Sequence, residues 1–244
     1  MTIIDATAAP DVGSKRLRVA GWALHAYTAS GTVLALLALI AAVDGRPVRA
    51  LWILLAALII DGTDGLLARR LRVKETIPEF DGARLDDIVD YITYAFVPMV
   101  LLWAGGYLPG GPMGAVFAAI PLMASSYQFC RTDAKTDDHF FLGFPSYWNV
   151  VAFYAVVLDL APALTATILV VCAILVFVPI KYIYPSRTTT LRALNLTLAA
   201  LWLVLYAVIL VDMPQPSLVL VGLSLAYIAY YFLASVYLTV RIGL

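Results

Sequence analysis

The chain has 244 residues, of which 63% are hydrophobic and only 13% are charged, and its mean hydropathy is +0.91. A soluble domain of this length needs far more charged surface, so the composition excludes one and indicates a membrane protein. Basic and acidic residues number 16 each, which gives a formal net charge of zero. This balance excludes a nucleic-acid binder that depends on an overall positive charge.

Apolar segments follow one another along the chain, most of them close to the roughly 20 residues that cross a bilayer as a helix. They cover residues 20–43, 48–69, 83–106, 112–131, 145–161, 163–184, 190–212 and 216–240. The fifth segment is the shortest, and its boundary with the sixth, at residues 159–162, is the least marked. We therefore predict an all-α fold: a polytopic membrane helix bundle of about eight transmembrane helices, forming a single domain over residues 1–244.

The distribution of basic residues predicts how this bundle is oriented. With eight spans, all of the 16 lysines and arginines except Arg46 and Arg49 fall on the same side of the membrane. Loops on the cytoplasmic side carry an excess of Lys and Arg. We therefore expect both termini to face the cytoplasm, with residues 1–19 as a cytoplasmic N-terminal tail.

The segment between residues 61 and 90 concentrates charge in a chain that otherwise avoids it. Four of its carboxylates stand at helical spacings: Asp61 and Asp64 end the second apolar segment, and Asp86 and Asp90 begin the third. Residues three or four apart share a face of a helix. The loop between the two pairs contains Pro78, so the two helix ends can fold back beside each other, and the four carboxylates would converge.

Converging carboxylates indicate a site for divalent cations, because hard oxygen ligands suit Mg²⁺ and Mn²⁺. A pair of such ions a few ångströms apart can clamp a diphosphate and stabilise charge on a phosphoryl group during its transfer. Arg69 lies on roughly the same face as Asp61 and Asp64 and could reach a phosphate. Asp90, the furthest into its span, is the best placed to take a proton from an incoming alcohol.

Two other interpretations of the acidic segment remain open at this point. The four aspartates could form interfacial salt bridges with nearby arginines, which are Arg69, Arg70, Arg72 and Arg84. They could also belong to the ion pathway of a divalent-metal transporter, although transporters place such groups near the membrane midplane, often in paired halves. Here no second half repeats the motif. Asp87 lies off the face of Asp86 and Asp90, so a solvated or structural role is expected for it.

The pattern D-x-x-D-G-x-x-A-R followed by G-x-x-x-D-x-x-x-D resembles the signature of the CDP-alcohol phosphotransferase family. It is matched by Asp61, Asp64, Gly65, Ala68, Arg69, Gly82, Asp86 and Asp90. Twelve residues separate Arg69 from Gly82, which is a longer interval than most of the family has. The longer interval, with LDDIVDYITY after Gly82, HAYTASG at 25–31 and GFPSYWN at 143–149, resembles the bacterial members that use choline as the acceptor.

This resemblance implies a membrane enzyme that condenses CDP-diacylglycerol with choline and releases CMP. It also implies Mn²⁺ or Mg²⁺ as cofactor, a homodimer, and a place in the bacterial inner membrane with the active site facing the cytoplasm. By position, the metal ligands would be Asp61, Asp64, Asp86 and Asp90, and Asp90 would also be the general base. The residues that line the CDP site would be Asp61, Gly65, Ala68, Arg69 and Gly82.

The acceptor is less strongly indicated than the nucleotide. A quaternary ammonium cannot donate hydrogen bonds, so its recognition needs aromatic faces or a carboxylate. The aromatic residues near the cytoplasmic ends are Tyr91, Tyr94, Tyr127, Phe144, Tyr147, Trp148, Tyr182 and Tyr184, and most are expected to pack helices or lie at the interface. We predict choline contacts from Tyr94, one turn beyond Asp90, and from Trp148 and Asn149, which follow a polar loop.

Other acceptors remain possible within the same class, namely serine, glycerol phosphate and inositol phosphate. A phosphorylated acceptor would need an extra basic cluster, and the loop 131–145 offers only Arg131 and Lys135 among several acids. In the first span, His25, Thr28 and Ser30 could contact nucleotide or phosphate, or could bond a neighbouring helix.

Overall fold

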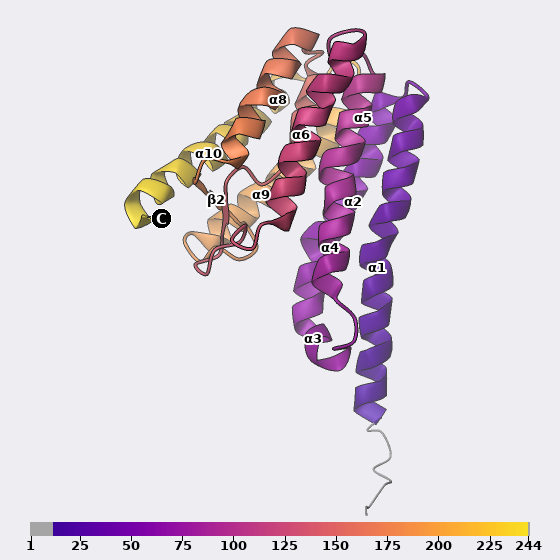
Figure 1. Cartoon of the computed structure of the whole chain (residues 1–244), viewed down its shortest axis with the longest axis vertical. Coiled ribbons are helices and arrows are strands. Elements are labelled where there is room, and N and C mark those ends of the chain that lie inside the picture. The colour runs from indigo at the N-terminus through magenta and orange to yellow at the C-terminus, as the bar shows by residue number, and fades with distance from the viewer. Residues whose placement is uncertain (1–11, 244) are drawn as a thin grey trace, which may run out of the picture.

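Two long helices begin the part of the chain that the computed structural model describes, residues 12–243. Helix α1 (Val12–Val43) and helix α2 (Pro47–Arg70) run antiparallel and pack along their length (Figure 1). Their contact is lined by small side chains, including Ala38 and Ala50, neither of which has any exposed surface. Small residues let two membrane helices approach closely.

Helix α1 begins earlier than the sequence predicted. Residues 12–19, expected to belong to a tail, continue the helix of the first span, and residues 1–11 lie outside the described part. Leu and Arg are good helix formers, so this stretch can extend the helix. Arg18 also ties it to the loop after α2, where it bonds the carbonyl oxygen of Thr76 at 2.9 Å and forms an ion pair with Glu79. The Arg18 guanidinium lowers the pKa of the Glu79 carboxyl.

The third predicted span is a continuous helical segment over Gly82–Ala104 with a change of pitch in its middle. Helix α4 (Gly82–Asp90) leads into a π-helical turn, η1 (Tyr91–Phe96), and then into helix α5 (Val97–Ala104). Pro98 follows the π-helical turn. A proline lacks an N–H and clashes with the carbonyl one turn before it, and a wider turn relieves that conflict. The short helix α3 (Val73–Thr76) lies in the loop before α4.

The middle of the chain combines one long helix with two shorter ones. Helix α6 (Pro112–Cys130) is followed by helix α7 (Trp148–Val157) and helix α8 (Pro162–Val176), and the break between the last two falls where the sequence placed it. Strand β1 (Phe140–Leu142) pairs antiparallel with strand β2 (Lys181–Ile183), with Phe141 opposite Tyr182. The predicted segment 163–184 is therefore shorter as a helix, because residues 181–183 pair as a strand instead, and the segment 145–161 is helical only over Trp148–Val157.

Helix α9 (Arg192–Val211) and helix α10 (Leu218–Ile242) complete the bundle, and α10 leans away from the upright helices of the first half (Figure 1). Within residues 12–243, six helical segments are long and apolar enough to cross a membrane. Large apolar side chains point outward along them, such as Leu218 and Val240, each 82% exposed, while Ser125 and Ser224 are fully buried. Apolar surface outside and polar groups inside fit a helix bundle in lipid, so the predicted fold class is confirmed. The predicted number of about eight spans is too high for the described residues, because the fifth and sixth segments form the shorter helices α7 and α8.

Candidate active site

Three of the four aspartates, from α2 and α4, come together in one small volume. One carboxylate oxygen from each of Asp61, Asp86 and Asp90 can be chosen so that all three lie within 4.8 Å of one another. Asp61 comes from the second half of α2, and the other two come from one face of α4. The spacing places Asp86 and Asp90 on one face of α4 as predicted, and the fold brings Asp61 to them, so three of the four aspartates expected to converge form one group.

The fourth aspartate, Asp64, lies beside this group and is held by α1. It is 5% exposed, and its Oδ2 accepts a hydrogen bond of 2.8 Å from the hydroxyl of Thr28. Asp61 is held in a similar way, because the hydroxyl of Tyr94 donates to its Oδ2 at 2.5 Å. Each of these aspartates therefore has one oxygen fixed by a hydroxyl from a neighbouring helical segment. Such hydrogen bonds orient ligands before a cation binds.

The salt-bridge interpretation of the four aspartates is not supported. Among the described residues, no ion pair joins any of them to an arginine, and Arg84 lies 3.9 Å from Asp81 instead. Carboxylates held this close repel one another unless a cation lies between them. Their oxygen atoms are the donor set that Mg²⁺ and Mn²⁺ prefer, so the residues present fit a divalent-cation site.

Two glycines of the signature, Gly65 and Gly82, leave room for a neighbouring side chain because they carry none of their own. A Cβ atom added to Gly65 would lie 3.4 Å from a guanidinium nitrogen of Arg69, so this arginine folds back over the glycine. A Cβ added to Gly82 would lie only 2.7 Å from Cε1 of His25, so a glycine is needed there to admit the imidazole. Ala68 packs on the small apolar cluster beside α3. These four motif residues therefore come from the ends of α2 and α4 that carry the aspartates.

Comparison with known proteins agrees with this arrangement. The chain is 38% identical over 225 residues to a phosphatidylcholine synthase of Borreliella burgdorferi, covering 91% of this chain and 96% of that protein. It is 40% identical over 211 residues to a phosphatidylcholine synthase of Pseudomonas aeruginosa, covering 86% and 88%. A phosphatidylcholine synthase of Legionella pneumophila is 39% identical over 227 residues. The chain belongs to the phosphatidylcholine synthase family. No protein-family model matches it.

The residues predicted to contact choline are separated in the structure of this family member. Tyr94 lies at the acidic group through its bond to Asp61. Trp148 has no exposed surface, its indole N–H donates to Ser125 Oγ at 2.6 Å, and its ring packs on Phe144. Asn149 is 5% exposed, and its Oδ1 accepts from the backbone N–H of the next residue. Trp148 and Asn149 are therefore packed in the core, and only Tyr94 adjoins the aspartates.

The aromatic residue of this segment that lies beside Tyr94 is Tyr147, the neighbour of Trp148 in the chain. The ring centroid of Tyr147 lies 5.9 Å from that of Tyr94 and 6.4 Å from that of Phe141 on β1. Tyr184, just after β2, stacks on Phe141 at 4.3 Å. The strand pair thus adds an aromatic wall beside Tyr94. From sequence, Tyr147 and Tyr184 stood out only as interfacial aromatics, because nothing local predicts that the two strands meet.

Lys135, in the loop between α6 and α7, places its charged end beside α4. The ammonium of Lys135 lies 3.7 Å from Oδ1 of Asp87, the residue for which a solvated or structural role was expected. Burial disfavours the charge on Lys135, but the neighbouring carboxylates, first Asp87 and then Asp86, raise the pKa of its ammonium above the ordinary value. Lys135 is therefore held charged at the edge of the site.

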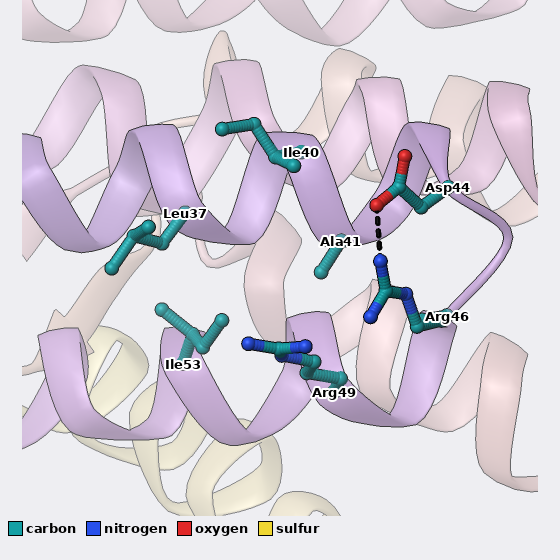
Figure 2. A pocket seen from close by; sticks show the side chains of 7 residues that line it. All are labelled: Leu37, Ile40, Ala41, Asp44, Arg46, Arg49 and Ile53. Carbon is teal, nitrogen blue, oxygen red and sulfur yellow. Dashed lines mark hydrogen bonds and ion pairs between the residues drawn. The ribbon is translucent and has the colours of Figure 1, made fainter.

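A groove elsewhere on the molecule does not belong to this site. It has a volume of about 280 Å³ and lies between α1 and α2 near the turn that joins them (Figure 2). Its walls are largely apolar, and its carboxylate, Asp44, is paired with Arg46. Asp61 and Asp64 lie nearer the other end of α2, so the groove and the acidic group are separate features.

Proposed function

We propose that this membrane protein is a phosphatidylcholine synthase that transfers the phosphatidyl group of CDP-diacylglycerol to choline, with CMP as the second product. The observation that carries the proposal is the meeting of Asp61, Asp86 and Asp90 within one small volume. The names of the relatives support the same reaction. The residues at the site fit the CDP-alcohol phosphotransferase signature, and we assign the chain to that wider family.

Asp61, Asp64, Asp86 and Asp90 would hold Mn²⁺ or Mg²⁺, as a pair of ions. Bound ions would neutralise the diphosphate and stabilise the charge that develops on the departing CMP. The nucleotide part of the substrate would lie over the small residues Gly65, Ala68 and Gly82. Arg69, folded over Gly65, supplies a cation for a phosphate there.

Asp90 is assigned as the general base. It accepts the proton of the choline hydroxyl, and the choline oxygen then forms a bond to the phosphorus that carries diacylglycerol. The bond from that phosphorus to the CMP oxygen breaks, and CMP leaves with the electron pair. Asp90 suits this task because it lies in the carboxylate group while standing one turn from Tyr94, where the acceptor would enter.

For the choline site we propose Tyr94 together with Tyr147, whose rings lie beside each other next to Asp61. A quaternary ammonium is attracted to such aromatic faces and to a nearby carboxylate. Tyr147→Leu should raise the KM for choline several-fold and leave the KM for CDP-diacylglycerol near its original value. Tyr127→Leu is the matched control, because that ring packs on Phe177 and Arg131 instead. Equal changes in both KM values for Tyr147→Leu would remove this ring from the choline site.

We further propose that the site faces the cytoplasm from the inner membrane of a bacterium and that the protein is a homodimer. The basic residues other than Arg46 and Arg49 support this orientation, because the acidic group lies at the end of α2 away from those two arginines. Cross-linking in membranes followed by mass measurement tests the dimer.

The experiment that tests the function is CMP release by detergent-purified protein given CDP-diacylglycerol and Mn²⁺. Choline, serine, glycerol 3-phosphate and inositol phosphate are supplied in separate reactions. Release with choline alone is the expected result. Release with another acceptor would keep the phosphotransferase chemistry and overturn the choline assignment. No release from folded protein in any reaction would refute the enzyme and return attention to a divalent-metal transporter.

A further inference from the structure

The loop between α6 and α7 holds Lys135 in a defined position. Lys135 pairs with Phe141 in an isolated antiparallel bridge, and the backbone N–H of Leu142 donates to Ala134 O at 2.9 Å. The N–H of Thr136 donates to Phe140 O at 2.9 Å, which closes the turn. Because β1 is itself paired with β2, the backbone on both sides of Lys135 is fixed.

Lys135 differs from the other cations of this region in how little of its hydrogen-bonding capacity is used. Arg131 makes two bonds of 2.6 Å to Asp133, and Lys181 bonds Asp138 at 3.0 Å. Within residues 12–243, Lys135 has one ion pair, with Asp87 at 3.7 Å, which is longer than a hydrogen bond, and its side chain is half exposed. An ammonium carries three donors, so donors remain free to meet a ligand.

The Lys135 ammonium lies close to the part of α4 that carries the assigned base, Asp90. Asp87, whose carboxylate lies 3.7 Å from the Lys135 ammonium, directly follows Asp86 and precedes Asp90 by three residues on α4. Arg69, the cation of the signature motif, lies at Gly65 on α2. One cation thus comes from α2 and the other from the loop between α6 and α7, and Lys135 is the one next to the helix that carries the assigned base.

We propose that Lys135 binds the phosphoryl group that is transferred, the one that carries diacylglycerol, and holds it against the choline oxygen. This inference rests on the proposed function, because it takes CDP-diacylglycerol as the substrate. Asp87 positions the lysine, because the ion pair between the two keeps the ammonium beside α4. A lysine acts on phosphate as a point charge, so its removal weakens binding of that phosphoryl group and leaves the nucleotide contacts in place.

The test compares Lys135→Met with Lys74→Met, an exposed lysine on α3 at the same end of the bundle. Loss of a hydrogen bond to a charged group should raise the KM for CDP-diacylglycerol about tenfold or more and leave the KM for choline within about twofold. Lys135→Arg should keep more of the affinity than Lys135→Met, because it retains the charge. Lys74→Met should behave as the unaltered protein.

Inhibition of the reaction by CDP and by CMP shows which of the two phosphoryl groups of the substrate Lys135 binds. CDP carries the second phosphoryl group and CMP lacks it, so Lys135→Met should weaken inhibition by CDP about tenfold and leave inhibition by CMP unchanged. If both nucleotides weakened equally, or if neither did, the assignment of Lys135 to the transferred phosphoryl group would be wrong. A change in the KM for choline alone would place the lysine on the acceptor side and would also refute it.

The role of Asp87 is tested in the same assays. Asp87→Asn should raise the KM for CDP-diacylglycerol less than Lys135→Met does, and it should add nothing further in the Lys135→Met background. Additive effects of the two substitutions would show that Asp87 acts independently of the lysine. The unaltered protein decides the proposed function through CMP release with choline, so a failure of the Lys135 assignment cannot be mistaken for a failure of the reaction.

Discussion

Thr28 provides the sharpest test of how the acidic group is built. Its side chain is buried in α1, 7% exposed, and its hydroxyl donates to Asp64 Oδ2 across the helix interface at 2.8 Å. Thr28→Val replaces the hydroxyl by a methyl group of similar size. The substitution therefore removes one donor from Asp64 and leaves the packing of α1 on α2 largely unchanged.

The size of the effect follows from the bond that is lost. A hydrogen bond to a charged group contributes about 1.5–3 kcal/mol, and its loss leaves a buried carboxylate oxygen without a protein partner. Groups that orient a metal ligand from behind typically change metal affinity or activity by about 10–100-fold. At about 1.4 kcal/mol for each factor of ten, the two ranges agree. We expect Thr28→Val to raise the Mn²⁺ concentration needed for half-maximal activity by about 10–100-fold.

The assay is an Mn²⁺ titration of CMP release at saturating CDP-diacylglycerol and choline. Thr32→Val is the matched control, because Thr32 lies one turn further along α1 and its hydroxyl bonds Ala29 O of its own helix at 2.7 Å. Gel filtration of both variants checks that they remain folded. If Thr28→Val showed the same Mn²⁺ dependence as Thr32→Val, the bond to Asp64 would have no part in holding the metal.

Three further substitutions test the other assignments. Asp90→Asn should abolish turnover and largely spare CDP-diacylglycerol binding in a filter assay, and near-normal turnover would exclude Asp90 as the base. Arg69→Ala should weaken CDP-diacylglycerol binding about tenfold or more, as the loss of a charged hydrogen bond predicts; unchanged affinity would refute its phosphate contact. Gly82→Ala would place a Cβ 2.7 Å from the His25 ring, so it should lower activity, and His25→Ala in the same chain should restore part of it. No restoration would mean that the clash is not the cause.

Local spacing was sufficient to predict the acidic group, because the information lies within single helices. Asp61 is three residues from Asp64, and Asp86 is four residues from Asp90, so each pair had to share a face. The loop between them left the two helix ends free to meet. Apolar segment lengths likewise predicted most helices, since each one must satisfy its own backbone in lipid.

Contacts across distant segments could not be predicted in this way. Lys135 reaches Asp87 only because β1 pairs with β2, and those strands are short and lie between apolar helices. The same pairing places Tyr147 rather than Trp148 beside Tyr94. Tyr147 and Trp148 are adjacent at the start of α7, and their side chains point in different directions. The segment GFPSYWN contains both, so it cannot show which of the two packs in the core. The role of Thr28 stayed open between a substrate contact and a bond to a neighbouring helix, because its bond to Asp64 joins residues 36 positions apart.

The length of α1 fixes how deep in the bilayer the reaction would take place. Its 32 residues span about 48 Å at 1.5 Å per residue, whereas the hydrocarbon layer is about 30 Å thick. Thr28, which bonds Asp64, lies 15 residues before the end of the helix at Val43, or about 22 Å along its axis. With that end at one membrane boundary and the helix upright, the aspartates would lie several ångströms inside the opposite boundary.

A site at that depth suits two substrates of unlike solubility. The diphosphate of a lipid lies at the boundary already, so CDP-diacylglycerol can enter sideways between helices with both acyl chains still in the bilayer. The first turns of α1, where Arg18 pairs with Glu79 of the loop before α4, would then stand in the headgroup region and form one wall of the approach from water. Choline and CMP would pass along that wall, while the lipid product diffuses away within the membrane.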